Sequence, residues 1–148
     1  MSHAVKCESG SQRRLEIGPG HTDLDRLLHW LGHADAAGRR AGRSTVRERG
    51  PGIVMGLVQC LTSHDVTIRR EAVDLLRDLP GAEQAVTGLA GATADEDWLV
   101  RLWAIDALGR LRAGTPPVFS ALDQALEDPM PLVRNAAFIA LSKVNAPS

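Results

Sequence analysis

The sequence is poor in aromatic residues and in cysteine, and both shortages narrow the fold classes that fit it. Aromatic side chains make up 3% of the 148 residues, and tyrosine is absent. A core of leucine, alanine and valine therefore fits better than an aromatic-rich barrel or sandwich. The two cysteines, Cys7 and Cys60, lie far apart, so they predict neither a disulfide framework nor a zinc motif, and we expect a reducing compartment.

The sequence also lacks a long apolar run. No segment approaches the ~18 consecutive apolar residues that a membrane-spanning helix needs. Residues 1–20 are polar and contain no apolar stretch of the kind found in a signal peptide. We therefore expect a soluble, cytoplasmic protein. Every basic residue except Lys6 and Lys143 is arginine, which we attribute first to the codon bias of a GC-rich, bacterial genome.

The net charge of −1 is unevenly distributed along the chain. Residues 1–50 hold nine Lys and Arg against six Asp and Glu, which gives +3, and residues 51–148 hold eight against twelve, which gives −4. The basic excess falls in one cluster: Arg39, Arg40, Arg43, Arg47 and Arg49. This cluster is either a solvated segment or a site for phosphate groups or an acidic partner. The pI of about 6.5 argues against a nucleic-acid groove.

One short pattern occurs three times. It reads IRREAV at residues 68–73, VRLWAI at residues 100–105 and VRNAAF at residues 133–138. The anchoring arginines Arg69, Arg101 and Arg134 are 101 − 69 = 32 and 134 − 101 = 33 positions apart. Self-similarity at this period predicts an array of stacked units, whose usual role is to present an extended binding surface.

Apolar residues spaced three and four apart predict helices along most of the chain. We expect helices near residues 24–31, 53–61, 68–79, 86–89, 98–111, 118–126 and 132–144. For residues 34–49 the pattern leaves two alternatives open, a weak helix carrying arginines or a basic loop. Connections of ~3–7 residues make consecutive helices antiparallel, so we expect stacked helical hairpins.

The third copy of the pattern carries a family resemblance. Residues 128–137 resemble the entry into the second helix of HEAT repeats of the short, bilin-lyase-related type, and residues 95–104 keep the same six-residue spacing from Asp to Arg. The first copy departs from it, with Ser63 at the Asp position and Asp65 two residues later. The resemblance covers residues 52–145. It implies an all-α, right-handed solenoid of three clear hairpins with a degenerate N-terminal helical cap. Residues 21–148 then form one domain after a flexible leader at residues 1–20.

The resemblance also implies a structural role for the repeated arginine. In HEAT arrays this arginine and the loop aspartate form a ladder that ties successive repeats together. The residues that match this ladder are Arg69, Asp95, Arg101, Asp128 and Arg134.

Leu102 and Ile139 fall on a stripe of the second helices that forms the concave face in such arrays, and both are poor choices for a solvated surface. Trp103 lies beside them, and an apolar patch with an aromatic anchor is typical of a protein contact. In the alternative, Trp98 and Trp103 cover the seam between repeats. The predicted partner-binding set adds charged residues for orientation: Leu102, Trp103, Ile139, Arg70, Arg77 and Asp106.

Familiar catalytic motifs are absent from the sequence. There is no Gly-rich phosphate loop, no Gly-x-Ser-x-Gly elbow, and no His-Glu pair like those of the HEAT-type hydroxylases. His64 and Asp65 form a dipeptide seen in metal phosphohydrolases, but the remaining histidines do not complete a ligand set. We therefore predict no enzyme activity, no metal and no cofactor.

The predicted function is that of an adaptor that binds another protein, with a second copy of the chain as a further candidate at the exposed ends of the array. The last helix has a mildly apolar outer face, which suggests that a partner covers this end. The alternative is binding of nucleic acid or a phosphate ligand through the arginine cluster. That alternative includes a role like that of the HEAT-like DNA glycosylases, for which Trp98, Trp103, Asp97 and Arg101 offer the residue types.

Overall fold

The computed structural model describes residues 31, 32 and 35–147, and in this part of the chain all regular structure is helical. The α-helices are α2 (Ala36–Arg49), α3 (Val54–Cys60), α4 (Val66–Asp78), α5 (Val86–Ala92), α6 (Trp98–Leu111), α7 (Pro116–Ala125) and α8 (Pro131–Asn145). Two short 3₁₀ helices, η1 (Gly50–Ile53) and η2 (Ala82–Ala85), lead into α3 and α5. The predicted leader lies outside the described residues, and so does the helix predicted near residues 24–31 except for its last residue, Leu31, which is helical and buried.

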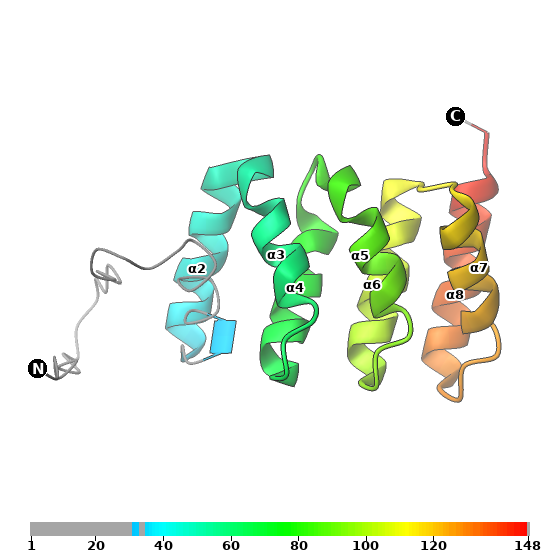
Figure 1. Ribbon diagram of the computed structural model, residues 1–148, viewed down its shortest axis with the longest axis horizontal. Helices are drawn as coiled ribbons and strands as arrows, with labels where there is room; N and C mark the ends of the chain where they lie inside the picture. Colours follow the sequence, from blue (N-terminus) through cyan, green and yellow to red (C-terminus); the bar gives the residue numbers. More distant parts are fainter. Residues whose placement is uncertain (1–30, 33–34, 148) are drawn as a thin grey trace, which may run out of the picture.

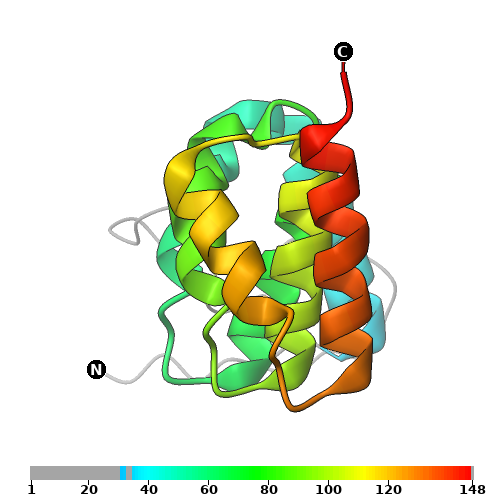
Figure 2. The same ribbon diagram turned by 90° about the vertical axis from the view of Figure 1, so that its right-hand side faces the viewer.

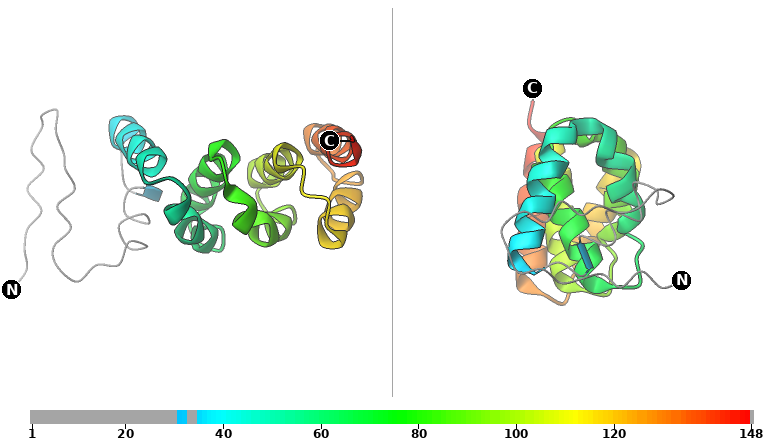
Figure 3. Two further views of the ribbon diagram at one scale, coloured as in Figure 1. Left: turned by 90° about the horizontal axis from the view of Figure 1, so that it is seen from above. Right: turned by 90° about the vertical axis from the view of Figure 1, so that its left-hand side faces the viewer.

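The helices form a row of antiparallel hairpins, α3 with α4, α5 with α6 and α7 with α8 (Figure 1). Seen from above, the row has two layers (Figure 3). One layer holds α3, α5 and α7, and the other holds α4, α6 and α8, with α2 at its N-terminal end. We call the surface of this second layer the second-helix face. The architecture is the predicted all-α solenoid.

The hairpins begin and end at residues with specific backbone preferences. The Asp65 side chain caps α4 by accepting a hydrogen bond from the Thr67 amide at 2.8 Å, and Asp97 caps α6 by accepting one from the Val100 amide at 3.1 Å. Proline in the first turn starts α7 and α8. After α4 the chain turns at Gly81, which has a φ of 76°. Residues with a side chain rarely adopt this backbone conformation, so glycine is favoured here.

Small residues let the two layers and successive repeats approach closely. Ala72, Ala104 and Ala137 occupy equivalent positions in α4, α6 and α8, and all three are completely buried. Between α6 and α8 the contact is tighter still, because a carbon added to Gly109 would lie 3.0 Å from the Ala140 Cα. A larger residue at these positions must push the helices apart.

Residues 36–49 form helix α2, which decides between the two alternatives left open by the sequence. Val46 is buried, and it is an apolar residue of α2 that contributes to the core. Most other positions of this helix are polar or alanine, which is why the hydrophobic pattern alone did not distinguish a helix from a loop. The arginine cluster therefore lies on a helix.

We predict that Ala104→Leu lowers the free energy of unfolding by about 1–3 kcal/mol, because Ala104 is completely buried and the core has no space for the added carbons. Urea unfolding followed by circular dichroism measures the change. Ala37→Leu is the matched control, since Ala37 is exposed on α2. An Ala104→Leu variant as stable as the parent would contradict the placement of this face in the core.

Candidate functional site

Arginine and aspartate pairs connect each hairpin to the next. Arg69 donates from Nε to Asp95 Oδ2 at 2.9 Å and from Nη2 to Asp95 Oδ1 at 3.2 Å. Arg101 repeats this geometry with Asp128, at 2.7 Å and 2.9 Å. Each pair is a two-bond fork between a planar guanidinium and a carboxylate, the strongest form of such a contact. The pairs therefore hold successive repeats in one register.

The third guanidinium nitrogen of each ladder arginine binds the loop before its own helix. Arg69 Nη1 donates to the Ser63 carbonyl at 2.8 Å. In the same way Arg101 Nη1 donates to the Asp95 carbonyl at 3.0 Å, and Arg134 Nη1 donates to the Asp128 carbonyl at 2.7 Å. The same arginine thus orders the loop of its own repeat and the contact to the next one. Among the described residues, Arg134 binds the loop of its own repeat but no aspartate of another repeat.

Asp128 has a lowered pKa, which follows from its partners. Burial by itself would raise the pKa, but the hydrogen bonds from Arg101 and the Met130 amide, with the positive charges of Arg101 and Arg134, outweigh it. A carboxyl group with a lowered pKa in the folded state stabilises the fold above its unfolded-state pKa, near 3.8. The stabilisation is lost as the pH falls through the lower, folded-state pKa.

We predict that Asp128→Asn lowers the free energy of unfolding at pH 7 by about 1.5–3 kcal/mol, because the charged partner of Arg101 is lost. The difference from the parent shrinks at pH 3, which lies below the unfolded-state pKa of 3.8, because the carboxyl group is then largely protonated in the unfolded chain. Urea unfolding at the two pH values measures both effects. The control is Asp123→Asn at an exposed position of α7. Equal losses at pH 3 and pH 7 would contradict the ionic role of Asp128.

A second charge network crosses the second-helix face from α2 to α6. Arg43 pairs with Asp74 and with Glu71, the latter at 3.0 Å, and Arg77 Nη2 donates to Asp74 Oδ1 at 2.6 Å. On α6, Arg110 Nε donates to Asp106 Oδ2 at 2.9 Å. Opposite charges therefore alternate over three helices of this face.

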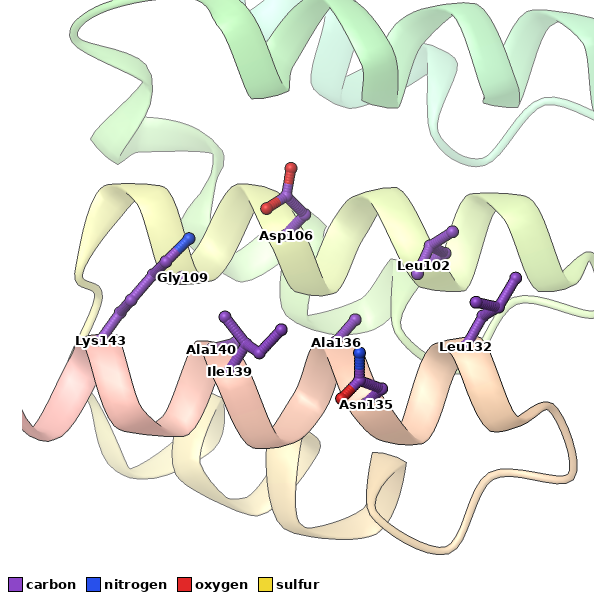
Figure 4. Close-up of a pocket in the computed structure, with 9 residues that line it drawn as sticks. All are labelled: Leu102, Asp106, Gly109, Leu132, Asn135, Ala136, Ile139, Ala140 and Lys143. Atoms are coloured by element: carbon purple, nitrogen blue, oxygen red, sulfur yellow. The ribbon is translucent and has the colours of Figure 1, made fainter.

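A hollow lies between α6 and α8 (Figure 4). Its volume is about 190 Å³. Apolar and small side chains form most of its wall, with one acidic and one basic residue at its rim. The lining residues are Leu102, Asp106, Gly109, Leu132, Asn135, Ala136, Ile139, Ala140 and Lys143.

The structure brings together half of the predicted partner-binding set. Leu102, Asp106 and Ile139 line the same hollow. Trp103 is half-buried, with the Arg77 guanidinium 5.3 Å from the centre of its ring. Arg70 lies elsewhere, because its guanidinium binds Asp97 with Nη2 to Oδ2 at 2.6 Å.

Leu132 and Lys143 also line this hollow, although neither belongs to the predicted partner-binding set. Leu132 is 56% exposed in the first turn of α8, and Lys143 reaches the other end of the hollow from the last turn (Figure 4). The predicted stripe consists of the positions one, five and eight residues after each ladder arginine. On α8, Leu132 lies three residues before the first of these positions, and Lys143 lies four residues after the second. A helical wheel extended by one turn at each end would have included them.

The predicted anion-binding arginines are distributed along α2. Arg40, Arg47 and Arg49 are exposed, whereas Arg43 is half-buried between two acidic residues of α4. Arg47 Nη2 lies 4.0 Å from Asp78 Oδ2. The side chain of Arg39 lies outside the described part of the chain. Acidic residues of α4 thus offset part of the positive charge that a phosphate ligand would meet.

Cys60 is a buried free thiol at the end of α3. Burial raises its pKa to about 11, so the reactive thiolate is scarce at neutral pH. Cys7 lies outside the described residues. Among the residues that are described, no three His, Cys, Asp or Glu side chains come together as they would to hold a metal ion.

In a Cys7→Ser variant, we predict that the remaining thiol reacts with a colorimetric disulfide reagent at pH 8 at least about 100-fold more slowly than in denaturant. Burial and the raised pKa of Cys60 both cause the slow reaction. The same variant in guanidinium chloride supplies the reference rate. Rapid labelling of the folded protein would contradict the packing around the end of α3.

These observations define an α-solenoid of stacked two-helix repeats with an arginine–aspartate ladder. The model of the HEAT-repeat family matches residues 54–142, which is more than half of the chain, and the chain belongs to this family.

A relative from Pseudanabaena tenuis, the uncharacterized phycocyanin operon protein Z, is 32% identical over 131 residues. The match covers 83% of this chain and 61% of the relative, so the chain spans less than two thirds of that protein.

Two solved structures are also similar. Human deoxyhypusine hydroxylase has a TM-score of 0.64 at 26% identity, and the match covers 93% of this chain and 50% of the hydroxylase chain. The complex of CpcE and CpcF of phycocyanin lyase from Nostoc sp. PCC7120 has a TM-score of 0.58 at 17% identity, with coverage of 80% and 98%. At this low identity, the similarity to the lyase complex shows a shared fold alone.

The prediction that the chain is not an enzyme is wrong in the light of these similarities, because both solved structures are named for enzymes. The absence of familiar motifs did not justify it. Catalytic groups on a repeat scaffold sit at exposed positions that vary from array to array, so this fold does not exclude catalysis. Among the described helices, none combines the length and the apolar character that crossing a bilayer requires.

Proposed function

We propose that the chain binds a partner protein on the second-helix face, at the hollow between α6 and α8. The observation that carries the proposal is the apolar lining of the hollow. Leu132 and Ile139 are 56% and 44% exposed, and they lie beside Leu102 in the same concavity. Burying such neighbouring aliphatic side chains against a partner removes apolar surface from water, which favours association.

The charges around the hollow indicate the chemistry of the partner. Asp106 already accepts a hydrogen bond from Arg110 at 2.9 Å, so its charge is compensated within the chain. Lys143 has no acidic partner among the described residues. A segment with an apolar side chain next to an acidic one therefore fits the hollow, with the acidic group at Lys143.

The close approach of α6 and α8 makes this surface well defined before binding. Gly109 and Ala140 are in tight backbone contact at the base of the hollow, so its walls are carried by helices rather than by a loop. A preformed site loses less conformational entropy when the partner binds. This supports recognition of one defined segment of the partner.

Phosphate binding by the arginine cluster has less support. Arg43 and Arg47 lie next to Asp74 and Asp78 of α4, so an anion on α2 would also meet these carboxylates. The two functions differ in their salt dependence. Apolar capture persists as salt rises, whereas binding through phosphate contacts falls steeply.

We predict that Ile139→Asp lowers the amount of partner retained by the tagged protein from an extract of its native host by about tenfold or more, because a charge in an apolar contact costs binding energy. Quantitative mass spectrometry of the retained proteins measures the effect. The matched control is Met55→Asp, because Met55 is 54% exposed but lies on α3 in the other layer.

Circular dichroism shows whether each variant remains folded. Equal retention by the parent and the folded Ile139→Asp variant would exclude the hollow as the binding site. Retention that disappears at moderate salt for the parent and the control alike would favour the arginine cluster instead.

A further inference from the structure

The hollow between α6 and α8 has a filled counterpart one repeat earlier in the chain. Viewed along the row, α4, α6 and α8 stand in one layer, so the junction of α4 with α6 is equivalent to that of α6 with α8 (Figure 2). At the first junction the Arg77 guanidinium lies 5.3 Å from the centre of the Trp103 ring. The chain itself therefore fills this junction with a planar group and an aromatic ring.

At the second junction the same two repeat positions hold the smallest residues. Arg77 and Gly109 each lie eight residues after a ladder arginine. Trp103 and Ala136 each lie two residues after one. A hydrogen atom and a methyl group thus replace a guanidinium and an indole, and the hollow of about 190 Å³ lies beside them. Both of its walls belong to described helices, so it does not depend on what packs beyond α8.

A polar contact of the first junction is likewise replaced by apolar residues at the second. Arg70 binds Asp97 at the first junction, with Nη2 to Oδ2 at 2.6 Å. The residues at these positions one repeat later are Leu102 and Met130, and both are partly buried against the core. The second junction therefore lacks the internal ion pair and the internal filling together, which leaves an open space bordered by apolar side chains.

The volume of the hollow indicates the size of the group that fits it. About 190 Å³ is smaller than the roughly 300–1,000 Å³ of a site for a drug-sized ligand. It is larger than the roughly 150 Å³ in which an apolar protein cavity holds a benzene ring. One aromatic side chain of the size of an indole therefore fits the hollow.

We propose that the hollow receives a tryptophan side chain of the partner protein, with an acidic residue of the partner beside it. This inference rests on the proposed function and names the group that the partner inserts. The indole takes the kind of place that Arg77 and Trp103 fill one repeat earlier. The Asn135 side chain at the rim offers an acceptor for the indole N–H. The partner's carboxylate pairs with Lys143, which has no acidic partner among the described residues.

An arginine of the partner fits the hollow less well, although Arg77 fills the first junction. There Arg77 Nη2 donates to Asp74 Oδ1 at 2.6 Å. The corresponding carboxylate of the hollow, that of Asp106, already accepts a hydrogen bond from Arg110 at 2.9 Å. A second guanidinium would share Asp106 with Arg110 and would also meet the positive charge of Lys143. A neutral ring meets neither cost.

The ring is tested with indole-3-propionate, added to the full-length chain with ¹³C-labelled isoleucine and leucine methyl groups. Its ring current is expected to displace the methyl signals of Ile139 and Leu132 in a saturable way and to leave that of the buried Ile53 unchanged. Tryptamine carries the same ring with the opposite charge, so it is expected to bind about threefold or more weakly, and Lys143→Gln is expected to remove this difference. No saturable displacement, or equally tight binding of the non-aromatic cyclohexanepropionate, would overturn the inference.

A filling variant separates this inference from the proposed function. Ala136→Trp places the chain's own indole in the hollow and is expected to remain folded, to abolish binding of the probe and to lower retention of the partner about tenfold. Ala136→Phe is the smaller substitute if circular dichroism shows that Ala136→Trp does not fold. Excess indole-3-propionate is expected to release the partner retained by the parent, whereas cyclohexanepropionate is not.

The outcomes for Ala136→Trp and Ile139→Asp are read together on the same extract. Retention lowered by Ile139→Asp alone means that the partner binds the surface without inserting a ring, which overturns this inference and leaves the proposed function intact. Full retention by both variants excludes the proposed function. Binding of the probe by the parent with full retention by Ala136→Trp means that the hollow takes a free small molecule, which also overturns the assignment to a partner's tryptophan.

Discussion

The forked contact between a ladder arginine and the aspartate of the next repeat is the constraint on which the rest of the architecture depends. It joins the second helix of one hairpin to the interhelical loop of the next hairpin, through Asp95 and Asp128. Because the same arginine also binds the carbonyls of its own loop, the loop conformation and the stacking geometry are set together. The stacking then decides which side chains of α6 and α8 share a surface, including those of the hollow.

The spacing of Arg69, Arg101 and Arg134 was sufficient to predict the solenoid, because each repeat meets the same surroundings and local pattern therefore determines the fold. The sequence does not decide between a helix and a loop for the residues of α2, since they contribute few buried apolar side chains, among them Val46. The hollow could be predicted only in part. Leu102 and Ile139 stand out as apolar residues on a polar stripe, and a helical wheel extended by one turn adds Leu132 and Lys143. That the residues of α6 and α8 share one hollow depends on the close approach of Gly109 to Ala140, a contact between distant parts of the sequence.

The arginine content has a chemical use beyond the codon bias inferred from the sequence. Arg69, Arg70 and Arg101 each hold a carboxylate with two nitrogens, a geometry that lysine cannot reproduce. Arg77 also lies over the ring of Trp103, where a planar guanidinium stacks well. The prediction that the chain is no enzyme failed for a related reason. Sequence motifs describe local chemistry, while a repeat array assembles its surface from residues about one period apart.

The ladder has a direction: Arg69 and Arg101 each bind an aspartate of the neighbour on the C-terminal side. The hairpin of α5 and α6 is therefore held from both sides, because α6 packs against α4 and against α8. In a one-dimensional array the local free energy of opening follows the number of such interfaces. Among the described hairpins this one should open last, so the wall that α6 contributes to the hollow is the most rigid part of that surface.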